Sequence, residues 1–263
     1  MTDHPGWLRT DDDIHYRAVT SNDTGGLVTV GHDESHELWF QSGDVGICME
    51  TMAPKFLFGP DDLLAPLKEA GTVTRLANPS LWDALAAAII RHAVPSSDAR
   101  YRWQRLCRTH GEPVTRDGLT AWQFPSPDRM LALSATACAD IGVSYPMPRL
   151  HAASHAYLDH GEQWTQLPAH QLVTALQTIP KLSPWTARVT VADYTNDFSH
   201  YPYTDTAIGQ WARQLNPDRE WPRAAPAFKT AWEQITGEQT SAWTMLTYAW
   251  GITHGQPIRR ADQ

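Results

Sequence analysis

The first seventy residues of the chain alternate strand-like runs with turn-forming clusters. Apolar, β-branched and aromatic residues fill LVTV at 27–30, ELWF at 37–40 and VGICME at 45–50. The clusters GHDES and QSGD, which are rich in turn-forming residues, separate these runs at hairpin lengths. The pattern predicts a small antiparallel sheet within residues 1–71. We expect this sheet to pack on the rest of the chain, because so small a sheet buries too little surface to stand alone.

From about residue 72 the apolar positions follow a helical repeat instead. In NPSLWDALAAAIIRHA, Trp82, Leu85 and Ile89 fall on one face, and Asn78 is a candidate cap with Pro79 in the first turn. Similar patterns predict further helices at about 98–110, 127–140, 146–159, 167–179, 184–194, 205–215, 224–236 and 239–253. The predicted fold class is mostly α, with a helical domain at 72–263 that carries the N-terminal antiparallel sheet as a small subdomain.

Charge and composition narrow the classes of function. The formal net charge of −8 argues against non-specific nucleic-acid binding over the whole surface, but it is compatible with a local basic patch. No long apolar run occurs and the N-terminus is polar, so we expect no membrane span, no signal peptide and a cytoplasmic location. Cys48, Cys107 and Cys138 match no metal or redox spacing and are expected to be buried as small apolar residues.

The stretch TIPKLSPWTA at 178–187 predicts two helices joined by a tight turn. Apolar residues at 172, 175, 176 and 179 mark one face of the first helix. Pro180 ends that helix and Pro184 can start the next, because each proline restricts the residue before it to extended conformations. The second helix would begin at Pro184–Trp185, where exposed backbone N–H groups favour an anion such as phosphate.

Asp205 opens the next helical run, in YPYTDTAIGQWARQL. Two interpretations remain open for this residue. An aspartate in this position is an ordinary N-cap. A carboxylate that also faces a cleft lined by Trp185, Tyr201 and Tyr203 could stabilise a developing cation.

IPKLSPWTA followed by YPYTDTAI resembles the signature of the helix-hairpin-helix DNA glycosylase superfamily, in which a hairpin and a loop precede a catalytic aspartate. The separation of twenty residues between Trp185 and Asp205 is similar to that in the alkyladenine branch. WDALAAAIIRHAV resembles the first helix of the family's core, and SAWTMLTYAWGITHG resembles its last. FPSPDRMLALSATACADIGVSYPMPRLHAAS resembles an intervening family stretch, so the resemblance covers about residues 72–255. The N-terminal sheet also fits this branch.

This resemblance implies a monofunctional N-glycosylase for a damaged, alkylated base that is flipped out of duplex DNA. Asp205 would stabilise the oxocarbenium-like sugar and position water opposite the leaving base. Trp185 would stack on the base, or else anchor the hairpin in the core, and Tyr201 and Tyr203 would line the cleft or pack. Family members that also nick the strand carry lysine at the position of Trp185, so no lyase activity is expected. We expect a monomer without cofactor or metal.

Two departures from the family pattern concern residues that bind DNA. Lys181 and Ser183 replace both hairpin glycines, which permit positive φ and close approach to a phosphate. Their charge and hydroxyl could substitute for that contact, with Arg91 and Arg188 as further DNA-binding residues. Ala93 stands where the alkyladenine branch carries an intercalating leucine, and alanine is too small to wedge a base step apart.

These departures leave two alternatives. The same fold could hydrolyse the N-glycosidic bond of a free nucleoside, a nucleotide or a related small metabolite. It could also be a non-catalytic nucleic-acid-binding module in which Asp205 only caps a helix. His151 and His155 have metal-ligand spacing on a helix, but no third ligand is evident.

Overall fold

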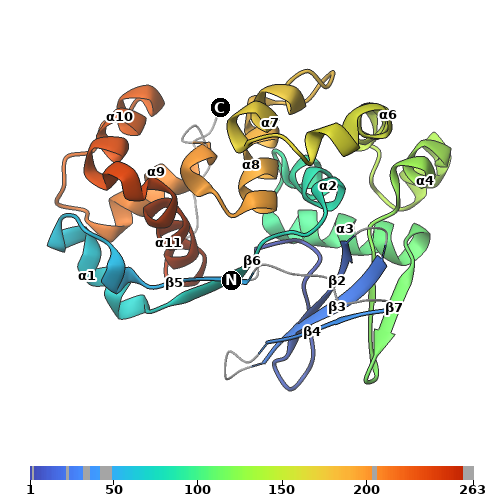
Figure 1. Ribbon diagram of the computed structural model, residues 1–263, viewed down its shortest axis with the longest axis horizontal. Helices are drawn as coiled ribbons and strands as arrows, with labels where there is room; N and C mark the ends of the chain where they lie inside the picture. The colour runs from blue at the N-terminus through green and yellow to red at the C-terminus, as the bar shows by residue number, and fades with distance from the viewer. Residues whose placement is uncertain (2, 22–23, 32–35, 42–48, 203–205, 257–263) are drawn as a thin grey trace. The chain divides into compact units, whose positions relative to one another are not determined.

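The computed structural model describes residues 1, 3–21, 24–31, 36–41, 49–202 and 206–256 (Figure 1). The chain forms two compact units that interleave along the sequence. The sheet-bearing unit takes residues 2–48 and 77–195, and the C-terminal unit takes residue 1 with 49–76 and 196–263. This division differs from the domain boundary expected at residue 71. The predicted fold class, mostly helical with a small N-terminal antiparallel sheet, is confirmed.

The main sheet of the sheet-bearing unit has the strand order β1-β2-β3-β4, and all of its neighbours are antiparallel. Its strands are β1 (Leu8–Arg9), β2 (His15–Ser21), β3 (Thr24–Val30) and β4 (His36–Phe40). The predicted strands at 27–30 and 37–40 are therefore confirmed as β3 and β4. Gly26 pairs with Phe40, and a Cβ at Gly26 would lie 2.5 Å from the Phe40 ring, so this pairing depends on glycine. Part of the predicted strand at 45–50 lies outside the described residues.

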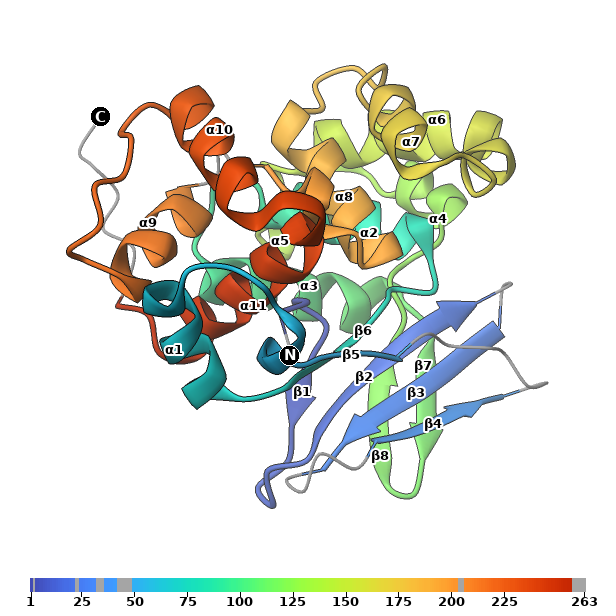
Figure 2. The same cartoon turned by 60° about the vertical axis from the view of Figure 1, so that its left-hand side comes forward.

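A second hairpin lies in the stretch 110–126, between two of the predicted helices, where no strand was predicted. Its strands β7 (Pro113–Arg116) and β8 (Leu119–Trp122) pair across Asp117 and Gly118, which have φ of 50° and 80°. Asp-Gly with positive φ at both positions forms the tight turn that suits a two-residue hairpin. Figure 2 shows this hairpin beside the main sheet, and a small core formed by Ala18, Leu27, Val114 and Ala121 joins the two.

The helices of this unit surround α2 (Leu81–Arg91), in which every residue from 81 to 90 is buried. The neighbouring helices α3 (Ser96–His110), α6 (Met147–Trp164) and α8 (Pro184–Thr195) pack against it. The remaining helices are α4 (Pro127–Ala132), α5 (Ala135–Asp140) and α7 (Ala169–Leu176). A helix that is apolar on all sides is expected to be central in the core, as α2 is. The helix predicted at 127–140 is two short helices, α4 and α5.

The cap predicted at Asn78 is wrong. Ser80 caps α2, because its Oγ accepts a hydrogen bond from the Asp83 amide at 3.2 Å. Asn78 is instead buried, and its side-chain amide donates to Asp83 at 2.6 Å and to Asp193 at 3.0 Å. These bonds join the start of α2 to the end of α8.

Asp83 is the centre of this buried polar network. The guanidinium of Arg17 on β2 and Nε2 of His4 each lie 3.0 Å from Asp83 Oδ1. Burial alone would raise the pKa of Asp83, but the neighbouring His4 and Arg17 and the hydrogen bonds from His4 and Asn78 outweigh it and lower that pKa from 3.8 to about 2. Asp83 therefore stays ionised inside the core and fixes the sheet to α2.

The C-terminal unit combines a two-stranded sheet with four helices among its described residues. The strands are β5 (Met49–Met52) and β6 (Val73–Leu76), which pair antiparallel. The helices are α1 (Asp61–Ala70), α9 (Thr206–Leu215), α10 (Ala225–Thr236) and α11 (Thr240–Thr253), with short 3-10 turns at Pro54–Phe56, Phe198–His200 and Gly237–Gln239. The strand pattern predicted for the first seventy residues did not anticipate α1.

Close packing in this unit is set by aromatic rings. Gly251 on α11 lies directly against the Trp211 ring of α9, where an added Cβ would come within 1.9 Å of a ring carbon. Elsewhere in the chain, Cys107 and Cys138 are buried free thiols, as predicted, and Cys48 lies outside the described residues. Within the part of the chain that the structure describes, no helix is long and apolar enough to cross a membrane.

Candidate functional site

The predicted hairpin joins α7 to α8 and turns without a glycine. After α7 the chain continues through single turns, in which Ile179 N–H donates to the Leu176 carbonyl and Leu182 N–H donates to the Ile179 carbonyl, each at 3.2 Å. Lys181 at the tip has φ of 68°, in the left-handed region that normally favours glycine. Its side chain is exposed. Lysine therefore adopts the backbone conformation for which the motif ordinarily uses glycine.

Ser183 caps the second helix of the hairpin. Its Oγ accepts a hydrogen bond from the Thr186 amide at 3.1 Å and lies 2.9 Å from the Thr186 hydroxyl. Pro184 follows as the first residue of α8, where its missing N–H is not needed. The Ser183 hydroxyl, expected to contact DNA, is therefore engaged within the hairpin itself.

Trp185, in the first turn of α8, is half-buried and lies beside His92. Their ring centroids are 5.6 Å apart and the His92 ring meets Trp185 edge-on, at 61° between the planes. His92 directly follows α2, and the next residue, Ala93, has φ of 60°. The loop after α2 is thus packed on the start of α8.

The chemistry of His92 makes it a candidate for contact with a ligand. Burial first, and then the positive charge of Arg149 at the start of α6, lower the pKa of His92. The imidazole is therefore neutral at pH 7. Its Nδ1 is buried and has no hydrogen-bond partner among the described residues. A buried ring nitrogen without a partner is costly, and a bound polar group would satisfy it.

Two of the expected cations of the site are close in sequence to the residues of this contact. Arg91 is the last residue of α2 and precedes His92, and Arg188 lies one turn after Trp185 on α8. Both side chains are half-buried. The sheet-bearing unit therefore contains Lys181, Ser183, Trp185, Arg188 and Arg91, and four of them belong to the hairpin.

The predicted aromatic residues after α8 belong to the C-terminal unit. Tyr201 is only 3% exposed, and its ring stacks on Phe198 at 5.6 Å and contacts Tyr248 at 5.2 Å. In this structure Tyr201 is a core residue of that unit. Tyr203 and the predicted catalytic Asp205 lie outside the described residues.

Sequence reasoning did not select His92 or Arg149. Both lie in stretches that carry the family resemblance, His92 in WDALAAAIIRHAV and Arg149 in the segment ending PRLHAAS. A signal for His92 was present, since a polar side chain ends the apolar run of α2 immediately before the predicted wedge position. His151 and His155 belong to no group of three His, Cys, Asp or Glu residues suited to a metal ion within the described part of the chain.

Comparison with solved structures shows what this arrangement resembles. A 3-methyladenine DNA glycosylase from Archaeoglobus fulgidus matches with a TM-score of 0.73 at 14% identity, over 95% of this chain and 90% of that one. An 8-oxoguanine glycosylase/lyase from Clostridium acetobutylicum gives a TM-score of 0.69 at 11% identity, over 95% and 89%. The chain has a DNA glycosylase fold.

A third match covers less of this chain. The 3-methyladenine DNA glycosylase Mag1 of Schizosaccharomyces pombe, in complex with abasic DNA, gives a TM-score of 0.61 at 15% identity over 76% of this chain and 95% of that one. No family model matches the sequence, and a search of curated proteins found no relative. At these identities the similarity establishes the fold alone.

Proposed function

We propose that this chain is a DNA N-glycosylase that removes a damaged base by hydrolysing its N-glycosidic bond, the first step of base excision repair. The observation that carries the proposal is the hairpin, in which Lys181 takes the left-handed conformation of the motif and Ser183 caps the helix that bears Trp185. A fold shared with DNA glycosylases for 3-methyladenine and for 8-oxoguanine supports the same class of reaction.

An alkylated base is the substrate that suits Trp185 best. Alkylation of a ring nitrogen makes a purine electron-poor and often cationic, and such a ring stacks favourably on an indole face. The neutral His92 beside Trp185 adds a polar group without adding positive charge that would repel the base. Trp185 also replaces the lysine that a lyase step would use, so the proposed enzyme forms no Schiff base at this position.

The proposed chemistry needs one carboxylate. When the C1′–N bond of a cationic alkylated purine breaks, the bonding electrons leave with the base, which departs neutral and requires no general acid. Asp205 would stabilise the positive charge on the sugar, and water would attack C1′ from the opposite face while losing a proton to the carboxylate or to solvent. The product is a free base and an abasic sugar.

The test measures base release from alkylated duplex DNA, from 8-oxoguanine duplex DNA and from free alkylated nucleosides, for the wild type and Asp205→Asn. We expect release from alkylated duplex, abolished in the variant, and no trapping of an enzyme–DNA adduct by borohydride. Asp218→Asn is the matched control, because Asp218 is exposed and lies in the same unit. Equal activity of Asp205→Asn and the control would contradict the assigned role.

A second candidate is an N-glycosidase for free nucleosides or nucleotides. It is favoured by Ala93, whose small exposed side chain cannot fill the gap left by a flipped base. Release from free nucleosides with none from duplex DNA would select this alternative. Tight DNA binding without any base release would select a non-catalytic binding module.

A further inference from the structure

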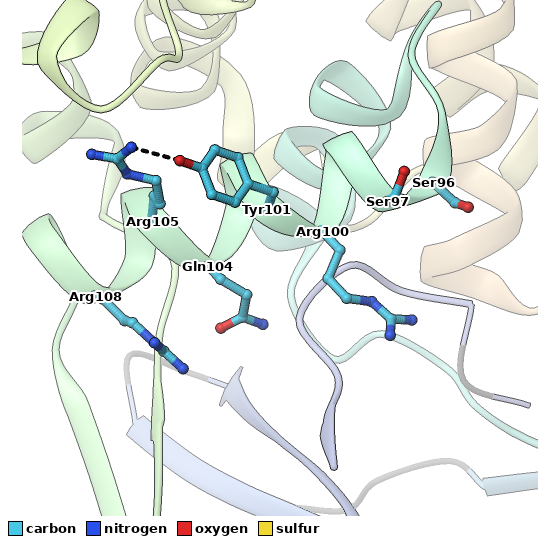
Figure 3. Close-up of a pocket in the computed structure, with 7 residues that line it drawn as sticks. All are labelled: Ser96, Ser97, Arg100, Tyr101, Gln104, Arg105 and Arg108. Carbon is cyan, nitrogen blue, oxygen red and sulfur yellow. Dashed lines mark hydrogen bonds between the residues drawn. The ribbon is translucent and has the colours of Figure 1, made fainter.

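The exposed face of α3 carries a row of basic and polar side chains (Figure 3). An open groove of about 610 Å³ follows this face, lined by Ser96, Ser97, Arg100, Tyr101, Gln104, Arg105 and Arg108. From residue 97 onward these positions recur at steps of three and four, so they share one side of the helix. The opposite side carries Ala99, Trp103 and Leu106, which are buried in the core. The polar row is therefore the solvent side of an amphipathic helix.

Two of the three arginines of the groove, Arg105 and Arg108, are held in place by contacts that do not neutralise them. Arg105 donates to the Tyr101 hydroxyl at 2.7 Å, the dashed line in Figure 3, and to the Asp140 carbonyl at 3.2 Å. The Arg108 guanidinium lies over the Trp122 ring, 5.2 Å from its centroid. Among the described residues, none of the three arginines forms an ion pair with a carboxylate. In a chain of net charge −8, this is an uncompensated positive cluster.

The groove begins close to the hairpin contact described above. His92, which packs edge-on against Trp185, is separated from the first groove residue, Ser96, by only three residues. Both elements belong to the sheet-bearing unit. From Ser97 to Arg108 the helix rises about 16 Å at 1.5 Å per residue. Measured along the duplex axis, at about 3.4 Å per phosphate of one strand, this length spans roughly five phosphates.

We propose that the α3 groove binds the phosphodiester backbone of the DNA strand that flanks the base held at the hairpin. The identity of the polymer rests on the proposed function, whereas the groove's preference for a row of anions rests on its own charges. Guanidinium groups suit this task because their planar N–H donors match phosphate oxygens in pairs. The contacts of Arg105 and Arg108 aim these donors before DNA arrives, which reduces the entropy lost on binding.

The test compares the salt dependence of DNA binding for the wild type and the double variant Arg100→Gln/Arg108→Gln. Binding of a fluorescent duplex of about 20 base pairs is measured by anisotropy between 50 and 200 mM salt, where each lost phosphate contact lowers the salt slope by about 0.9. Losing two contacts lowers it by about 1.8. Wild-type affinity should then fall about 12-fold more than that of the variant over this range.

The matched control is Arg116→Gln/Arg129→Gln, which removes the same charge from the same unit. Both control arginines are partly exposed and already paired, with Asp117 and Glu112 at 2.9 Å each. The control slope should equal that of the wild type, and thermal melting should show that both double variants are folded. A groove variant with the wild-type slope, or a control with the same loss as the groove variant, would overturn the proposal.

Two further measurements distinguish a DNA strand from a small phosphate as the ligand, and the groove proposal from the proposed glycosylase function. Inorganic phosphate or free nucleotide that displaces the duplex at equal phosphate concentration would identify a small-anion site and overturn strand binding. Base release is assayed on the same preparations. Release with an unchanged slope refutes the groove alone, and a reduced slope without release from any substrate refutes the glycosylase alone.

Discussion

The left-handed conformation of Lys181 predicts an unusual order of stability for two variants. Lys181→Ala and Lys181→Gly remove the same charge, but only glycine removes the Cβ that makes φ of 68° unfavourable. A non-glycine residue in this region costs roughly 1–2 kcal/mol. In Lys181→Gly, the greater backbone entropy of glycine in the unfolded chain offsets about 0.5–1 kcal/mol of this gain. Lys181→Gly should therefore be more stable than Lys181→Ala by about 1 kcal/mol.

Urea unfolding followed by tryptophan fluorescence measures this difference, which corresponds to roughly 2–4 °C in melting temperature for a chain of this size. Lys229 provides the control, because it lies inside α10. There the order should reverse, with glycine about 1 kcal/mol less stable than alanine. An alanine variant at 181 as stable as the glycine variant would refute the backbone argument. If Lys181 contacts a phosphate, both variants should bind DNA more weakly by the same factor. The slope of log affinity against log salt concentration should also be smaller by about 0.9 in both.

Three other predictions concern the buried network, the hairpin contact and the aromatic core. The pKa of Asp83 is 3.8 in the unfolded chain and about 2 in the folded protein. Ionised Asp83 therefore stabilises the fold fully above pH 3.8, and this stabilisation is lost as the pH falls through about 2. The free energy of unfolding should therefore fall by about 2 kcal/mol between pH 5 and pH 2, as measured from urea unfolding curves at each pH. This fall should be absent in Asp83→Asn. The His92 imidazole should titrate below 6.5 by NMR, and Arg149→Gln should raise its pKa; an unchanged or lower value would contradict the assigned cause. Gly251→Ala should lower the free energy of unfolding by roughly 1–3 kcal/mol or more, because the added methyl group would clash with the Trp211 ring. A variant with the urea midpoint of the wild type would show that the ring moves aside without cost.

Sequence patterns located the helices well where a proline stands in the first turn. The predicted segment 184–194 is α8 (Pro184–Thr195), and 224–236 is α10 (Ala225–Thr236). Periodicity failed where signals conflicted. The stretch 61–70 lies among strand-like runs and contains a proline, yet it forms a helix that starts with two aspartates. In the stretch 110–126 the Asp-Gly turn was a usable hairpin signal that the surrounding charged residues obscured.

Part of the candidate site could be predicted from the sequence. Motif spacing indicated Trp185 and the hairpin, because both lie within one short segment. The contact between His92 and Trp185 joins residues 93 positions apart and depends on how α2 packs on α8, which a local pattern does not contain. Tyr201 illustrates the opposite difficulty, since an aromatic residue before a helix suits either a pocket wall or a core, and burial decides for the core. Asp205 and Tyr203 stay predictions.

The interleaved units also set an order for folding during synthesis. All residues of the sheet-bearing unit, including the bonded pair Asn78 and Asp193, have been made at Thr195, and the synthesis of Asn196–Gln263 follows. At about 5–20 residues per second that interval lasts roughly 3 to 14 s. The early segment 49–76 has no such partner, because α1 packs on α9 and α11, which emerge last. The buried leucines of α1 therefore stay without their native partners in the nascent chain until α9 and α11 have been made.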